Sequence, residues 1–312
     1  MPYYGYVGSS LQDISILDTH GHFDDDVIIT HITIDTKISP LKCSFSVFNN
    51  SMVDLSNQVD FRKYAFVANI ETIIIDCKTC SFTDFTCFKK LQRFDFRCLD
   101  HDFLINLRLP DTLKTLLIKD NQSLTNMTFP IGLQRLELYD DYNCSLADII
   151  FPDKLRFINF GKEISLENII LPKGIEKVGI EYDTWKTLVD LDYPESLTSV
   201  VFWSPKEPKF KIRIRIPSNF THIKTNYRSI ESKFVFFPET LHKLTILDRA
   251  KSLNDLPQSI EELHIQSVIN DVTNLPINLK KIIISDMTHE DIQKKFIKLP
   301  YGCVIINKNI IT

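Results

Sequence analysis

One short phrase occurs twice within the stretch 109–138 of this chain. LPDTLKTLLI begins at Leu109 and FPIGLQRLEL begins at Phe129. In each copy, apolar residues follow the proline at three, six and eight positions, and the two prolines, Pro110 and Pro130, lie 20 residues apart. A phrase that recurs at a fixed period builds a stack of similar units, each of which packs against its neighbours.

The period extends over most of the chain. Successive anchoring prolines are separated by 20, 22, 20, 22, 23, 21, 19, 19 and 24 residues. They are Pro110, Pro130, Pro152, Pro172, Pro194, Pro217, Pro238, Pro257, Pro276 and Pro300. The N-terminal third lacks the proline but keeps three-residue sets at the same spacing, of which the Asn50 set is the weakest. These sets are Leu11/Ile14/Ile16, Ile29/Ile32/Ile34, Asn50/Val53/Leu55, Ile70/Ile73/Ile75 and Leu91/Phe94/Phe96.

The spacing predicts the structure of one unit. The last two apolar positions are two residues apart, so in an extended chain their side chains point to the same face. β-Branched and aromatic residues are common there, which favours a strand. A lone strand cannot bury this face, whereas parallel neighbours form a continuous core. About 12 residues remain for the return path, which suits a loop or a 3₁₀ turn rather than a long helix.

A small polar residue or Cys usually stands two positions after the last apolar one. Such side chains bond to the backbone where a chain leaves a strand, and we expect them to link neighbouring units. Examples are Asp120, Asp140, Asp248 and Asp286. Cys77 and Cys98 occupy this position in adjacent units.

The predicted architecture is an α/β repeat solenoid with about 14 to 15 short parallel strands on one face. Residues 1–312 form a single solenoid in this prediction, with a cap at 1–10 and repeats of about 21 residues over 11–284. Little helix is expected except in the C-terminal cap, 285–312. There Thr288 precedes acidic residues and an apolar helical spacing, which predicts a helix over 288–299 before a final strand, Cys303 to Ile306.

The phrase L-x-x-L-x-L resembles leucine-rich repeats, and this resemblance implies that the α/β solenoid is a leucine-rich-repeat solenoid, or horseshoe. The LP-x-x-L-x-x-L-x-I form, and Asn159-Phe160-Gly161 ahead of Leu171-Pro172, are more similar to the FNIP repeats, a family known mostly from amoebae and the large DNA viruses that infect them. This resemblance implies a non-catalytic scaffold that binds another protein along its strand face. FNIP proteins often carry an N-terminal F-box, so the alternative is a substrate-recognition subunit of a ubiquitin ligase. Residues 1–66 read as strands, however, and show no F-box helices.

The candidate partner-binding residues occupy outward positions on the predicted strands or lie just beyond a strand. Arg or Lys is frequent at the first outward position. The alternative interpretation is that these residues only solvate the open face of the sheet. The candidates are Arg93, Asp95, Arg135, Glu137, Phe157, Lys177, Trp203, His222, Lys224, Lys243, Glu262, His264 and Lys281.

Composition narrows the other classes of function. The net charge of −4 argues against nucleic-acid binding. No run of 18 apolar residues predicts a membrane span, and no signal peptide is visible at the start of the sequence. Seven cysteines without a signal favour a reducing compartment, so we expect a cytoplasmic protein, in host cytoplasm if it is viral. No enzyme motif or cofactor motif appears, which disfavours a catalytic or metal-dependent protein.

Three local patterns have a second interpretation. Cys77-x-x-Cys80, near Cys87 and Cys98, resembles a zinc site, but two of these positions are accounted for by the repeat. The stretch 20–26, with His-Gly-His and three Asp, would suit a metal but reads as a polar loop. The basic alternation KFKIRIRIP at 209–217 would suit phosphate or nucleic acid, yet it is better interpreted as a charged edge strand on a return path.

Overall fold

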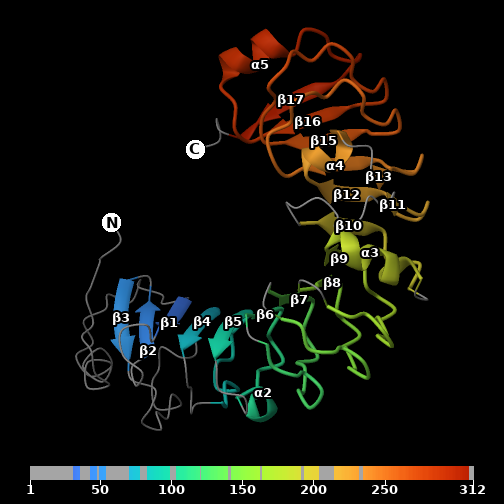
Figure 1. Cartoon of the computed structure of the whole chain (residues 1–312). Coiled ribbons are helices and arrows are strands. Elements are labelled where there is room, and N and C mark those ends of the chain that lie inside the picture. Colours follow the sequence, from blue (N-terminus) through green and yellow to red (C-terminus); the bar gives the residue numbers. More distant parts are fainter. Residues whose placement is uncertain are drawn as a thin grey trace. The chain divides into compact units, whose positions relative to one another are not determined.

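The computed structural model describes residues 31–35, 43–47, 49–53, 70–77, 83–98, 103–119, 121–139, 142–161, 164–190, 193–203, 214–231 and 235–308. The chain forms two compact units, Met1–Gly174 and Ile175–Thr312, here called the first and second unit. Each is built from short strands joined by turns and short helices (Figure 1).

In the first unit, five strands that are consecutive in sequence pair in parallel, as β4-β5, β5-β6, β6-β7 and β7-β8. The N-terminal strand β1 pairs in parallel with β4. Helix α2, Phe103–Asn106, lies on the return path after β5. The strands are β1 His31–Asp35, β2 Cys43–Val47, β3 Asn49–Val53, β4 Thr72–Cys77, β5 Arg93–Cys98, β6 Thr115–Ile118, β7 Arg135–Leu138 and β8 Phe157–Asn159.

Within the second unit the main strands follow the same design and pair in parallel, in the order β9-β10-β12-β14-β15-β16-β17. Its strands are β9 Lys177–Ile180, β10 Ser199–Phe202, β12 His222–Thr225, β14 Lys243–Ile246, β15 Glu262–Ile265, β16 Lys281–Ile284 and β17 Val304–Asn307. Its helices are α3 Tyr182–Val189, α4 Tyr227–Glu231 and α5 His289–Lys295. A parallel pair on the return path joins β11, Ile214–Arg215, to β13, Val235–Phe236.

The three apolar positions of the phrase form the core of both units, as predicted. In β7 and its lead-in, Leu133, Leu136 and Leu138 are fully buried, and in-register neighbours such as Leu116 and Ile158 continue the column. Complete burial of such a side chain contributes about 1.5–3 kcal/mol. Because each column runs from strand to strand, every turn depends on the turns beside it.

Two kinds of hydrogen-bonded turn recur on the described return paths. The proline carbonyl accepts from the first apolar residue, as in Leu113 N–H to Pro110 O at 3.1 Å. A second turn begins at a Ser or Asp whose side chain accepts from the N–H two residues later, at 3.0 to 3.3 Å. These turn residues are Asp84, Ser123, Ser145, Ser165 and Ser252. The four serines each begin the phrase S-L, whose leucine is buried, and sequence reasoning missed this second repeated signal.

A second set of polar side chains ties each turn to the one before it. The residue before the first apolar position donates to a backbone carbonyl 20 to 22 residues earlier, at 2.6 to 3.0 Å. These donors are Thr112, Ser196, Asn219, Thr240 and Asn278. The predicted ladder at the strand exits is confirmed at Asp248, whose Oδ1 accepts from Tyr227 N–H at 2.5 Å. Asp120 and Asp140 lie outside the described residues.

The fold has few helices, as predicted, and one of them, α3 in the second unit, packs its side chains into the core. Tyr182, Trp185 and Leu188 of α3 are all buried, at a helical spacing of three. Tyr182 stacks on Phe202, with 4.6 Å between ring centroids, and its hydroxyl hydrogen-bonds to Thr225 and, at 2.5 Å, to Ser229. Tyr182 thus provides a hydrogen-bond partner for the hydroxyl of Thr225, which occupies an otherwise apolar core position.

The weak N-terminal set was assigned wrongly. Asn50 and Val53 belong to β3, which pairs antiparallel with β2 rather than continuing the parallel stack, and β1 pairs directly with β4. A hairpin therefore replaces the predicted repeat there. Leu55, the set at residues 11–16 and the predicted cap at 1–10 lie outside the described residues.

The C-terminal helix is confirmed in kind but is shorter than 288–299. Thr288 caps it, accepting from Asp291 N–H at 3.1 Å, and helix α5 ends at Lys295. The Lys295 carbonyl accepts from Val272 N–H at 2.7 Å, and Phe296 forms a bridge with Val272. This pairing with the neighbouring return path ends the helix. The final strand, β17, begins at Val304 and ends at Asn307, one residue later than predicted at each end.

We predict that Gly132→Ala lowers the free energy of unfolding by about 1–3 kcal/mol. A Cβ at this position would lie 2.1 Å from the Asp111 carbonyl oxygen, so the backbone of two turns must shift. Urea denaturation followed by circular dichroism measures the change. The matched control is Lys154→Ala, at the same position of the next turn, where the exposed side chain already has a Cβ. Equal stability of the two variants would contradict this packing.

Candidate functional site

The outward positions of the first unit form two rows across its sheet. Strand register places Thr72, Arg93, Thr115, Arg135 and Phe157 in one row. The second row, two residues further along each strand, is Ile74, Asp95, Leu117, Glu137 and Asn159. The two arginines and two carboxylates balance, so this face carries no formal excess of charge among these positions.

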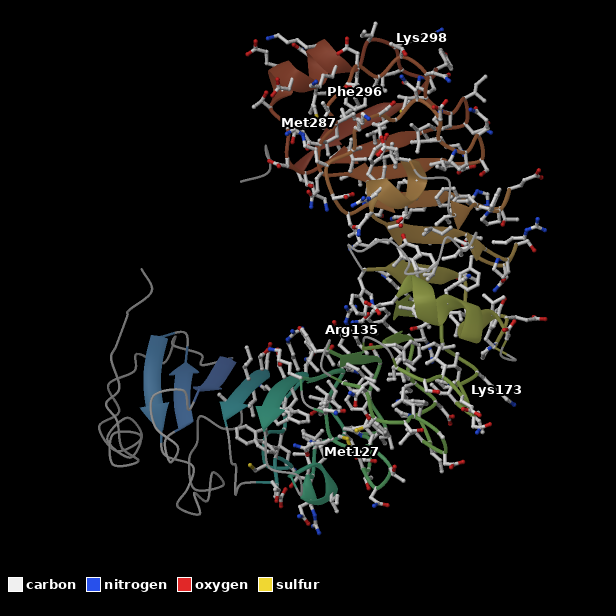
Figure 2. All side chains as sticks on the ribbon, viewed as in Figure 1. Met127, Arg135, Lys173, Met287, Phe296 and Lys298 are labelled. Atoms are coloured by element: carbon white, nitrogen blue, oxygen red, sulfur yellow. The ribbon has the colours of Figure 1, made fainter. Side chains whose placement is uncertain are left out.

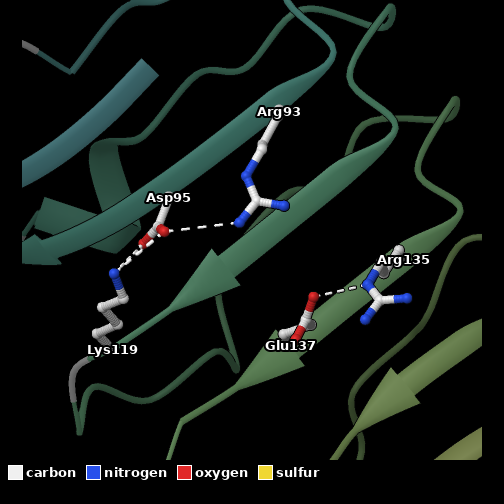
Figure 3. A network of polar contacts seen from close by, with 5 residues as sticks. All are labelled: Arg93, Asp95, Lys119, Arg135 and Glu137. Atoms are coloured by element: carbon white, nitrogen blue, oxygen red, sulfur yellow. Dashed lines mark hydrogen bonds and ion pairs between the residues drawn. The ribbon is translucent and has the colours of Figure 1, made fainter. Parts of the chain in front are cut away.

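The charges of the first unit are paired on the sheet (Figure 3). Asp95 lies between two cations: Lys119 Nζ is 2.9 Å from Oδ1, and Arg93 Nη2 is 3.8 Å from Oδ2. In the next turn but one, Arg135 Nε is 2.6 Å from Glu137 Oε1. Asp95 is only 4% exposed because these neighbours cover it. The outward carboxylates therefore hold the arginines in place.

Two cations also lie over aromatic rings. Arg135 Cζ is 4.1 Å from the centroid of Phe157, and Lys119 Nζ is 5.2 Å from that of Tyr139. Tyr139 remains 38% exposed, whereas Phe157 is 9% exposed under the guanidinium. Arg and Tyr are enriched where proteins bind one another most strongly. We call Arg93, Lys119, Arg135, Tyr139 and Phe157 the arginine–aromatic patch.

The second unit presents a different outward surface. Its first row is Lys177, Ser199, His222, Lys243, Glu262, Lys281 and Val304. Its second row is Gly179, Val201, Lys224, Thr245, His264, Ile283 and Ile306. Four lysines stand against one carboxylate at these positions, so the face is basic.

Glu262 is the centre of the polar contacts on this face. Its Oε1 is 2.8 Å from Lys243 Nζ and also bonds to Nε2 of His264. The bond from Lys243, helped by His264 and opposed by burial, lowers the pKa of Glu262 to about 2. Burial and then Lys243 lower the pKa of His264, while Glu262 acts to raise it. The carboxylate is thus ionised at neutral pH.

Strand register confirms the outward placement of most predicted residues, but not all of them are accessible. Asp95 and Phe157 are buried beneath their neighbours, and Trp203, just beyond β10, is partly buried. Two patch members, Lys119 and Tyr139, lie directly after β6 and β7. Neither was among the candidates, although Trp203, which was, also lies directly after a strand.

The described residues cover parts of the cysteine group and of the basic segment 209–217, but not the stretch 20–26. The Cα atoms of Cys77 and Cys98 are register partners in β4 and β5, as expected for equivalent repeat positions, while Cys80 and the stretch 20–26 lie outside the described residues. Among the residues that are described, no three His, Cys, Asp or Glu gather as metal ligands. Of the basic segment, β11 pairs with β13 on the return path and is not a repeat strand. No helix of the described ranges is long and apolar enough to cross a membrane.

The His264 pKa provides a direct test of the Glu262 cluster. We expect Glu262→Gln to lower the pKa of His264 further, since a stabilising anion is lost, and Lys243→Met to raise it, since a repelling cation is lost. NMR titration of the imidazole measures both shifts, and Lys298→Met, at an exposed residue beyond α5, serves as the control. Shifts of the same sign in the Glu262→Gln and Lys243→Met variants would contradict the geometry.

The lowered pKa values of His264 and Glu262 also affect stability. With these values the folded state binds fewer protons than the unfolded state, so the free energy of unfolding falls as the pH drops below about 6.5.

Comparisons with known proteins address the repeat type. Residues 121–163 match the family model of the FNIP repeat. No curated protein matches the chain. Among solved structures, CroV588 of the giant virus CroV, described as a circular LRR protein, is 16% identical at a TM-score of 0.40 and covers 80% of this chain and 48% of its own. The chain therefore spans about half the length of that protein.

A second solved structure is a leucine-rich repeat protein from Bacteroides ovatus. It is 12% identical, the match covers 89% of this chain and 92% of that protein, and the TM-score is 0.17.

The residues that match the FNIP repeat model, 121–163, include β7, β8 and the Ser145 turn between them. This stretch is therefore similar to the FNIP repeat, which confirms the resemblance indicated by the LP-x-x-L-x-x-L-x-I phrase.

Proposed function

We propose that this chain is a non-catalytic scaffold that binds another protein on outward positions of its strands. The repeat fold supports this role because its parallel sheet supplies a rigid, side-chain-rich face. The observation that carries the proposal is the arginine–aromatic patch of the first unit. Its cations are fixed by carboxylates and rings before any partner arrives.

Preorganisation is what distinguishes this patch from a merely solvated face. A side chain that is already fixed loses less rotamer freedom on binding, which otherwise costs about 0.5–1.5 kcal/mol per ordered side chain. Arg135 is held by Glu137 on one side and Phe157 on the other, yet remains exposed. Tyr139 adds an exposed aromatic ring nearby. Rings and a fixed guanidinium suit the centre of a protein–protein interface.

We expect the double variant Arg135→Glu/Tyr139→Ala to lose the partner. Loss of two anchors typically costs about 2 kcal/mol or more, which is about thirtyfold in Kd. Affinity capture from cell extract with quantitative mass spectrometry measures the loss. The control is Lys173→Glu, which reverses an exposed charge on the turn after Pro172, away from Arg135 (Figure 2).

Partners of the patch are captured by the unaltered chain and by Lys173→Glu, but not by the double variant. An F-box-binding adaptor protein in that set would favour the role of ubiquitin-ligase subunit. Capture of the same proteins by all three chains would contradict a partner site at the patch.

A further inference from the structure

The outward surfaces of the two units differ in their charge balance. In the first unit, the arginines of the rows are matched by Asp95 and Glu137. Within the two described rows of the second unit, the four lysines Lys177, Lys224, Lys243 and Lys281 outnumber the one carboxylate, Glu262, which gives these positions a formal excess of three positive charges. We call these four residues the lysine strip. The excess stands out because the whole chain carries a net charge of −4.

The strip runs across the strands. Register links Lys177 on β9 through His222 to Lys243 and Lys281, while Lys224 lies in the second row beside Thr245. With neighbouring strands about 4.8 Å apart, the five steps from β9 to β16 span about 24 Å. An extended segment of about seven residues covers that length.

Intramolecular ion pairs leave part of the strip uncompensated. Lys243 bonds to Glu262, but Lys224 and Lys281 form no ion pair within the residues that the structure describes. Both side chains are partly buried on the sheet, which limits their solvation. Other carboxylates lie at the ends of the strands, outside the two rows. They are Glu176 and Glu261 before β9 and β15, and Glu181 after β9, and Glu261 is already paired with Lys280 at 2.9 Å.

We propose that the lysine strip binds an acidic, extended polypeptide segment laid across the strands of the second unit. Charge complementarity identifies the occupant, and Glu262 supplies an internal example, because its carboxylate already sits 2.8 Å from a strip lysine. A protein segment fits better than a nucleic acid. The described outward rows of this unit hold no Phe, Tyr or Trp ring on which bases would stack.

This inference rests on the proposed scaffold function only in that both use outward strand positions. The residues differ, since the arginine–aromatic patch belongs to the first unit and the strip to the second. The double variant Arg135→Glu/Tyr139→Ala distinguishes the two sites. If it loses its captured partner but still binds the acidic peptide, the partner site and the peptide site are separate. If this variant keeps both its captured partner and the acidic peptide, the patch is not the partner site and the strip stays supported. If it loses the acidic peptide, the proposal for the strip is overturned.

The test uses a fluorescein-labelled oligo-glutamate peptide and fluorescence anisotropy on the full chain. We expect saturable binding that weakens as NaCl is added, and no binding of an oligo-lysine peptide. Lys224→Glu/Lys281→Glu should raise Kd about tenfold or more. The control, Lys251→Glu/Lys298→Glu, makes the same charge change at two exposed residues outside the rows and should leave Kd within about twofold.

Circular dichroism and thermal melting establish that each variant is folded. If charge reversal prevents folding, Lys224→Gln/Lys281→Gln replaces it, with an expected rise in Kd of about threefold or more. Three results would overturn the proposal: no binding of oligo-glutamate at low salt, equal losses in the strip and control variants, or tighter binding of single-stranded DNA than of oligo-glutamate. The last result would assign the strip to nucleic acid.

Discussion

No turn of this protein can bury its own apolar side chains, and each strand relies on its neighbours for hydrogen bonds. A strand such as β7, with only Leu136 and Leu138 facing inward, gains a core only because β6 and β8 present the same pattern in register. The regular period follows from this requirement. Because only the buried positions must repeat, the residue types outside them can vary. The outward rows therefore differ from one unit to the other.

The turns reinforce that dependence with polar contacts between neighbours. Hydroxyl and amide side chains such as Thr112 and Asn219 donate to carbonyls one turn back, and Asp248 accepts from the turn before it. These bonds satisfy backbone groups where the chain bends, which would otherwise be costly to bury. A rigid sheet results, and rigidity is what allows fixed outward side chains to serve as a binding surface.

The sequence was sufficient for the repeat, its buried columns and the outward residues, because all three follow from one period. The sequence was insufficient for features that the period does not determine. In the Asn50 set a polar residue fills an apolar position, and β3 forms a hairpin instead. Helix α3 carries its own Tyr182, Trp185 and Leu188 spacing, which a search at 21 residues overlooks. Pairing on the sheet, such as Lys119 with Asp95, depends on lateral distances that spacing alone does not give.

The register that assigns side chains to the outward face underlies every functional statement made of this protein. Cysteine pairs test it, because a disulfide needs Cα atoms within about 4.4–6.8 Å and suitably directed side chains. Thr115 and Arg135 are register partners in β6 and β7, whereas the side chain of Gln134 points elsewhere. Under mild oxidation, mass spectrometry should detect a cross-link in Thr115→Cys/Arg135→Cys and little in Thr115→Cys/Gln134→Cys. Preferential cross-linking of 115 to 134 would contradict the register and the surfaces derived from it.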